Sequence, residues 1–190
     1  MKNEIMLPGP FRDVIKDRPF LAGLKSGIVI ALGYIPIAIA FGLLADASGI
    51  SRQATVLMSL TVFAGASQFV GINMMALGAA GWEVVMTTFI LNLRHFLMTA
   101  SLSQKIETGI PRYVLCLIAF GVTDETFSMA SLRKGGRLPA AFLLGLNLVA
   151  FAAWNFGTWL GLLAGANLPQ ALQSSLGISL YAMFIGLLVP

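Results

Sequence analysis

The sequence of 190 residues is poor in charge and has one cysteine. Only 11% of its residues are charged, against about 25% in an average soluble domain, whereas 57% are hydrophobic. Such a chain has too few polar side chains to cover a globular surface in water, so we expect lipid to be its solvent. The single cysteine, Cys116, excludes an intrachain disulfide and a metal site with four thiolate ligands from this chain.

The small excess of basic residues does not predict nucleic-acid binding. Twelve Lys and Arg against eight Asp and Glu give a net charge of +4, and no basic face interleaved with aromatic residues is visible. The basic residues concentrate in 12–25 and 133–137, which is typical of loops on the cytoplasmic side of a membrane. A Gly-rich phosphate loop with Gly-Lys-Ser/Thr is absent from the sequence, so we do not expect this chain to hydrolyse ATP.

Apolar runs long enough to cross a bilayer recur along most of the chain. Residues 1–19 are polar or mixed and predict an amphipathic cytoplasmic segment lying on the headgroups, whereas 20–190 predict one transmembrane domain. We expect spans at about 26–45, 84–103, 113–132 and 140–164. The uncharged run 53–82 would be about 45 Å long as a helix, so one tilted or broken span is expected there, with a re-entrant part as the open alternative.

The last apolar run, 176–190, is too short to cross the bilayer. We therefore predict an all-α polytopic membrane bundle with broken helices, about five complete spans and a truncated sixth, C-terminally incomplete. If the 53–82 run crosses once, the distribution of basic residues in the loops favours a cytoplasmic N-terminus. The cytoplasmic side then holds Lys2, Arg12, Lys16, Arg18, Lys25, Arg133, Lys134 and Arg137, and the other side holds Arg52, Lys105 and Arg112.

Two segments are predicted to interrupt their helices inside the bilayer. In the first, residues 33–36, a glycine and a proline weaken the helix, because proline removes a backbone donor. In the second, residues 63–69, small and polar residues interrupt the apolar pattern. Interrupted backbone is tolerated at this depth only where protein buries it or where it lines a wet cavity, so both segments predict a solute path.

Charged residues near the bilayer centre also predict a functional site, since each costs at least about 2.5–3.5 kcal/mol to insert. Arg94 and His95 lie in the third expected span, and Asp124 and Glu125 lie in the fourth. Because Arg94 is the strongly basic residue at this depth, we predict an ion pair between Arg94 and one carboxylate. The second carboxylate would exchange a proton or hold an ammonium group; a purely structural role in tying helices together is the open alternative.

Four motifs follow one another in the chain: Gly33-Tyr34-x-Pro36 with Ala40-Phe41-Gly42, Phe63-Ala64-Gly65-Ala66-Ser67-Gln68-Phe69, Asn92-x-Arg94-His95-x-Leu97-Met98, and Asp124-Glu125-x-Phe127. Together they resemble the AzlC family, the large subunit of AzlCD-type branched-chain amino acid exporters, also called YgaZ or BrnF. The resemblance covers about 20–190. It implies export of valine, leucine and isoleucine, with methionine as a further candidate, across a bacterial inner membrane. It also implies coupling to the proton gradient and a small membrane subunit resembling AzlD.

Under this resemblance, free backbone groups at the two interruptions would hold the substrate carboxylate and ammonium, and Asp124 or Glu125 would carry the coupling proton, with His95 as a relay. The residues predicted to bind substrate are Gly33, Tyr34, Pro36, Gly65, Ser67, Gln68 and Asn92. No enzyme activity, cofactor or metal is expected.

Three other functions remain open. The chain would form an uncoupled channel for small solutes, or a scaffold subunit whose partner transports. An intramembrane serine hydrolase using Ser67 and His95 is disfavoured, because residues 65–69 lack the second glycine of Gly-x-Ser-x-Gly.

Overall fold

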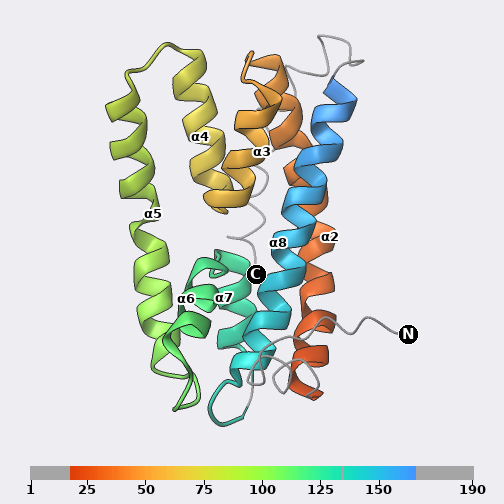
Figure 1. Ribbon diagram of the computed structural model, residues 1–190, viewed down its shortest axis with the longest axis vertical. Helices are drawn as coiled ribbons and strands as arrows, with labels where there is room; N and C mark the ends of the chain where they lie inside the picture. Colours follow the sequence, from red (N-terminus) through yellow and green to blue (C-terminus); the bar gives the residue numbers. More distant parts are fainter. Residues whose placement is uncertain (1–17, 134, 166–190) are drawn as a thin grey trace, which may run out of the picture.

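The computed structural model describes residues 18–133 and 135–165, which form seven helices (Figure 1). They are α2 (Arg18–Ala47), α3 (Arg52–Thr61), α4 (Gly65–Ala76), α5 (Gly81–Ser103), α6 (Arg112–Phe120), α7 (Asp124–Ser131) and α8 (Ala140–Gly165). Apart from one isolated bridge, no β-structure occurs in these ranges, so the all-α prediction is confirmed for them. Almost all of the predicted amphipathic segment 1–19, and all of the predicted sixth span, lie outside the described residues.

Two of the described helices, α2 and α8, are long and apolar enough to cross a membrane. They coincide with the first and fifth expected spans and run side by side in the same direction (Figure 1). A Cβ added to Gly27 would lie 2.7 Å from the Val149 Cβ, and one added to Gly157 would lie 2.7 Å from the Ala38 Cβ. Small residues thus allow the close helix contact that is common in membranes. Because α2 and α8 are parallel, the chain between them must return from the end of the molecule where α2 ends to the end where α2 begins.

The expected interruption at 33–36 is not present as a break, because α2 continues as one helix through Pro36. The proline does remove a backbone donor. However, α8 packs closely on either side of it: a Cβ added to Gly157 would lie 2.8 Å from the Ile35 carbonyl oxygen and 2.7 Å from the Ala38 Cβ. Packing along both halves therefore holds α2 continuous.

The 53–82 run folds as a hairpin of two short helices, α3 and α4, and not as one tilted span. At the turn between them, Phe63 has φ +38°, a left-handed backbone conformation that non-glycine residues rarely adopt. The Arg52 Nε, at the start of α3, lies 3.6 Å from the Asp46 Oδ1 near the end of α2. From the turn, α4 runs back beside α5 to the same end of the molecule (Figure 1). The hairpin therefore begins and ends at the same end of the molecule (Figure 1).

The expected fourth span, 113–132, is not one continuous helix, because α6 and α7 are bent by 116° at the break between them. The reason lies in contacts at the turn. Asn147 of α8 donates its Nδ2 hydrogen to the Ile118 carbonyl at 3.0 Å, and its side chain occupies the space where a Cβ on Gly121 would lie. Thr123 then caps the N-terminus of α7. Polar groups thus satisfy the backbone at the ends of both helices, and the chain turns back inside the molecule.

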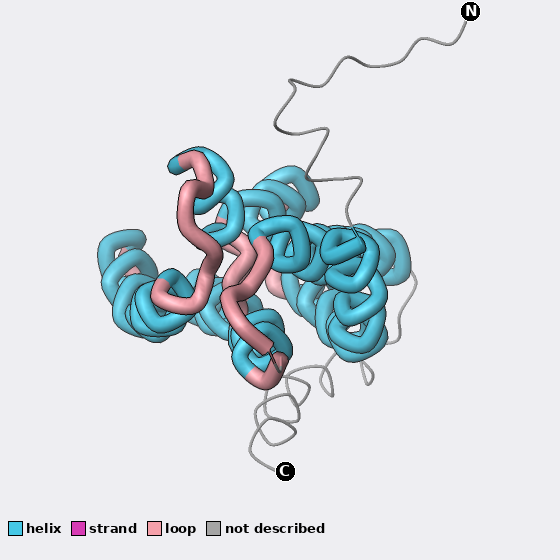
Figure 2. The backbone as a smooth tube through the Cα atoms, turned by 90° about the horizontal axis from the view of Figure 1, so that it is seen from below, coloured by secondary structure: helices cyan, strands magenta, loops and turns pink. Residues whose placement is uncertain are grey.

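The second hairpin enters from the end opposite to the first (Figure 1). At that end, the loops on either side of α6 and α7 lie against each other, as Figure 2 shows from below. Ile106 pairs with Leu138, and the Glu107 carboxylate accepts a hydrogen bond from the Ala140 amide at 2.9 Å. Lys105 therefore lies at the same end as Arg137, which corrects the predicted topology that placed them on opposite sides.

The helix α5 connects the two hairpins and runs along the full height of the molecule (Figure 1). It has 23 residues, which span about 34 Å. The described residues contain two helices long and apolar enough to cross a membrane, or three if the bent pair α6–α7 counts as one, so the predicted number of about six spans is not confirmed.

Candidate functional site

The turns of the two hairpins border one cavity in the middle of the molecule. Its volume is about 20 Å³, which is the space of roughly one water molecule. All three long helices contribute to it as well. The lining residues are Tyr34 from α2, residues 63–66 from the first turn, Arg94 and His95 from α5, Thr123, Asp124 and Glu125 from the second turn, and Trp154 from α8.

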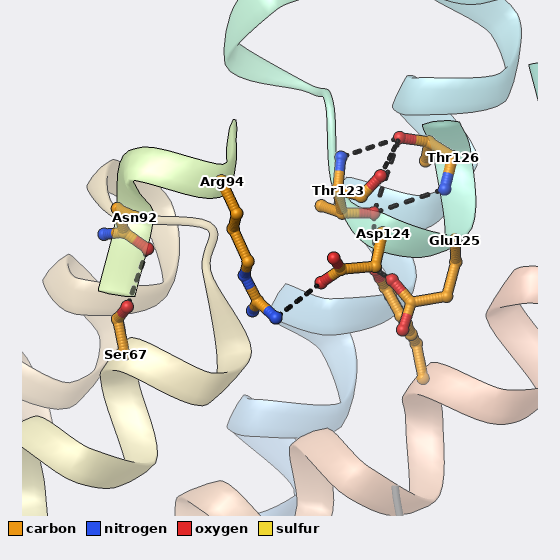
Figure 3. Close-up of polar contacts among 8 residues, drawn as sticks. Ser67, Asn92, Arg94, Thr123, Asp124, Glu125 and Thr126 are labelled. Atoms are coloured by element: carbon orange, nitrogen blue, oxygen red, sulfur yellow. Dashed lines mark hydrogen bonds and ion pairs between the residues drawn. The ribbon is translucent and has the colours of Figure 1, made fainter. Parts of the chain in front are cut away.

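An ion pair closes one side of this cavity. The Arg94 Nη1 of α5 lies 3.2 Å from the Asp124 Oδ2 of α7, as Figure 3 shows. The arginine side chain is 33% exposed and the aspartate side chain 28% exposed, so both are reached from outside the protein interior. This is the contact between the third and fourth expected segments that the sequence predicts. It neutralises Asp124 and leaves the neighbouring Glu125 to other partners.

Glu125 instead contacts a buried hydroxyl of α2. The Tyr34 Oη lies 2.7 Å from the Thr123 Oγ1 and is also hydrogen-bonded to the Glu125 Oε2. Tyr34 is only 5% exposed. Its ring packs edge-on against Phe63 and Trp154, with centroid separations of 6.4 and 5.3 Å. The phenol is thus fixed in position by aromatic contacts and points its oxygen at the start of α7.

Sequence analysis did not identify Thr123 as part of the site, although its signal is present. The Thr123 amide donates to the Thr126 Oγ1 at 2.8 Å, and the Thr126 amide donates to the Thr123 Oγ1 at 3.4 Å (Figure 3). Threonine followed by two acidic residues is a recognisable start of a helix. Reading it as such would have predicted the break before Asp124.

The other hairpin presents backbone to the cavity. Helix α4 begins at Gly65, and its N-cap residue, Ala64, provides no side-chain hydrogen bond. A Cβ on Gly65 would lie 2.6 Å from the Trp154 Cη2, so the indole ring occupies that space. The first amides of a helix have no intrahelical acceptor and carry a positive partial charge. The start of α4 is therefore suited to face a negative group.

The remaining polar residues of this hairpin lie outside the cavity lining. The Ser67 Oγ is 2.6 Å from the Asn92 Oδ1 and ties α4 to α5 (Figure 3). The Gln68 Nε2 donates to the Ser59 Oγ at 3.3 Å, and that hydroxyl is 2.9 Å from the Thr158 Oγ1 of α8. In this conformation three of the seven residues predicted to bind substrate, Ser67, Gln68 and Asn92, thus connect helices.

The other predicted site residues also divide into those that line the cavity and those that do not. Of the 33–36 segment, only Tyr34 lines the cavity; Gly33 and Pro36 are exposed on α2. His95 lines the cavity, and its Nδ1 has no hydrogen-bond partner among the described residues. Trp154 of α8 also belongs to the lining. Within 18–133 and 135–165 no group of three His, Cys, Asp or Glu side chains is arranged to hold a metal ion.

Comparison with known proteins gives the chain a family. The family model described as "AzlC protein" matches residues 29–168. The inner membrane protein YgaZ of Escherichia coli is 35% identical over 176 residues, 90% of this chain and 72% of that protein. An uncharacterized membrane protein of Archaeoglobus fulgidus is 37% identical over 177 residues, 92% of this chain and 77% of that protein.

A more distant relative carries a transport name. The branched-chain amino acid transport protein AzlC of Bacillus subtilis is 27% identical over 154 residues, 77% of this chain and 58% of that protein. No solved structure matches the chain.

Proposed function

This chain belongs to the AzlC family, a family of membrane transport, and we propose that it exports branched-chain amino acids across the bacterial inner membrane. In this proposal the substrates are valine, leucine, isoleucine and methionine, the driving force is the proton gradient, and a small AzlD-like membrane subunit takes part. One observation carries the proposal: two helix hairpins from opposite ends meet at a single cavity that is lined by one guanidinium, two carboxylates and the uncapped start of α4.

The charges of the cavity are complementary to an amino acid zwitterion. The uncapped start of α4 and the guanidinium of Arg94 would receive the substrate carboxylate. Asp124 and Glu125, at the start of α7, would receive the ammonium group. Broken helices that direct their backbone ends at a central site are a recurrent arrangement in secondary transporters.

The aromatic rings around the cavity supply apolar walls for a branched side chain. Tyr34, Phe63 and Trp154 pack against one another there. At about 20 Å³ the cavity holds no amino acid in this conformation. Substrate binding therefore requires the hairpins to separate, and we infer that each hairpin opens the site toward its own end of the molecule.

The test is transport of labelled amino acids into inside-out vesicles that contain the full-length protein, alone and with an AzlD-like subunit. Saturable uptake of leucine, isoleucine and valine, but not of charged or aromatic amino acids, is expected, and a protonophore should abolish it. Flux that does not saturate and ignores the pH gradient would indicate a channel. Uptake by vesicles that contain this chain without the small subunit would rule out a pure scaffold role.

A further inference from the structure

We propose that Glu125 is the residue that carries the coupling proton, with Tyr34 and Thr123 as its hydrogen-bonding partners in both protonation states, and that Asp124 stays ionised opposite Arg94. This inference rests on the proposed function, because it assigns the proton step of the same site. It depends on how differently the structure surrounds two carboxylates that are adjacent in the chain.

The carboxylates of Asp124 and Glu125, at the start of α7, contact different partners. Asp124 meets a full positive charge, with 3.2 Å between its Oδ2 and the Arg94 Nη1. Among the described residues Glu125 has no basic partner at ion-pair distance, and its contact is the neutral phenol of Tyr34. Protonation of Asp124 would remove the negative charge that faces Arg94, whereas protonation of Glu125 breaks no ion pair.

The hydrogen count around Tyr34 shows that its hydrogen bonds can form in both protonation states of Glu125. The phenol has one hydrogen but two oxygen neighbours, the Thr123 Oγ1 and the Glu125 Oε2. With Glu125 ionised, Thr123 donates to the Tyr34 Oη and Tyr34 donates to the carboxylate. With Glu125 protonated, the carboxyl donates to the Tyr34 Oη and Tyr34 donates to the Thr123 Oγ1. Only hydroxyl hydrogens rotate between these two arrangements.

The neighbours hold these oxygens in place in both states. The Thr123 Oγ1 belongs to the cap of α7, and the Tyr34 ring is packed against Phe63 and Trp154. The buried oxygens of Tyr34 and Thr123 keep a partner in both states, which avoids the cost of an unsatisfied buried polar group. The network is therefore built to take up and release one proton without moving a heavy atom.

This proton is exchanged against substrate charge. The other charged or titratable groups that line the cavity are Arg94 and His95 from α5 and Asp124 from α7. An ionised Glu125 adds a negative charge for the substrate ammonium, and a proton on its Oε2 removes that charge. As the substrate ammonium leaves on the outer side, a proton from that side forms the O–H bond on Glu125. This bond breaks on the cytoplasmic side, and the proton is released there before the next ammonium binds. One proton therefore moves inward for each amino acid exported.

The experiment uses the full chain with an AzlD-like subunit in proteoliposomes and two measurements: labelled leucine exchange as a function of pH, and accumulation driven by a pH gradient. Glu125→Gln should lose gradient-driven accumulation, and its remaining exchange should no longer depend on pH. Asp124→Asn, the adjacent control, should exchange less but keep the pH dependence. Absence of exchange by the wild type would refute the transport proposal itself.

Two results would overturn the proton assignment while leaving transport intact. One is Glu125→Gln with wild-type accumulation and pH profile; the other is loss of pH dependence in Asp124→Asn but not in Glu125→Gln. If Glu125→Gln shows no exchange, the pH dependence of exchange in Tyr34→Phe tests the proton assignment. This variant keeps the aromatic ring and removes the hydroxyl that contacts Glu125. A shifted pH midpoint in Tyr34→Phe, with none in the matched control Tyr113→Phe, supports the proposal, and an unshifted midpoint refutes it.

Discussion

The two hairpins reach the same cavity from opposite ends, and their turns differ in helix capping and in charge. The α3–α4 turn consists of Phe63, Ala64 and Gly65, and the helix that follows starts without a side-chain cap. The α6–α7 turn ends at Thr123, which caps α7, and two carboxylates follow directly. The first turn therefore exposes backbone amides with positive partial charge, and the second supplies full negative charges.

The hairpins are also held by different forces. The first is fixed by a fully buried group of hydroxyl and amide side chains, Ser59, Gln68 and Thr158, and by the close fit of Gly65 against Trp154. The second is fixed by groups that line or adjoin the cavity, namely Asn147, Tyr34 and Arg94. We therefore predict that substrate or protons alter the contacts of the second hairpin more directly than those of the first.

The largest effect we expect is an all-or-none labelling pattern that tests the opposite entry of the hairpins. Single cysteines replace the exposed Lys105, Arg137 or Arg52 in a Cys116→Ala background. An impermeant maleimide should label positions 105 and 137 from one side of the membrane and position 52 from the other, because the two hairpins do not cross. By the positive-inside rule, the side of Lys105 and Arg137 should be the cytoplasm. Labelling of 105 and 137 from opposite sides would contradict two re-entrant hairpins.

The next effect tests the close fit of the first turn. Gly65→Ala places a Cβ 2.6 Å from the Trp154 ring, which is only 2% exposed, so neighbouring groups must shift to admit it. Overpacking of this kind costs about 1–3 kcal/mol, so we expect a lower melting temperature and loss of leucine transport. Gly81→Ala is the matched control, since nothing lies within 4 Å of the added methyl. Equal behaviour of the two variants would remove the proposed role of Gly65.

A smaller effect is expected at the ion pair of the second turn. Arg94→Lys keeps the charge but loses the planar fork that contacts Asp124. Hydrogen bonds to charged groups contribute about 1.5–3 kcal/mol, so leucine exchange should fall by about tenfold or more. Exchange in proteoliposomes measures this. Wild-type exchange in Arg94→Lys would show that Asp124 needs only a positive charge nearby.

The smallest effect should come from the cap of α7. Thr123→Val keeps the shape of the side chain but removes the hydroxyl that accepts from the Thr126 amide. Loss of such a cap costs about 1 kcal/mol, measurable as a modest decrease in thermal stability. Thr123→Ser retains the hydroxyl and should behave as the wild type. A stable Thr123→Val protein would mean that the contacts of Asn147 alone define the second turn.

The sequence predicted best those helices whose signal is a continuous apolar run. The expected spans 26–45 and 140–164 lie within α2 and α8, and 84–103 lies within α5. The 53–82 run was recognised as abnormal because it was too long for one crossing. The 113–132 run had an ordinary length for a span, so its break at Gly121 gave no such warning. That break depends on Asn147, which is 29 residues from its partner, Ile118.

The site was predictable in its charges and not in its contacts. Arg94 and one carboxylate were paired from depth alone, and the structure contains that pair. The partner of Glu125 was not foreseeable, since Tyr34 lies 91 residues away in the chain. Pro36 raised an expectation of broken backbone that packing against α8 prevents. The roles of these residues in transport remain predictions.

Hydropathy is summed locally, so the sequence alone determined that this is a membrane protein and where its long apolar helices lie. The tertiary structure decided which helices run parallel, where the two hairpins turn back, and which carboxylate meets an arginine and which a phenol. These outcomes depend on contacts between residues far apart in the chain, where a glycine admits a neighbouring backbone or an asparagine fills a turn. Such contacts exist only once the helices have packed.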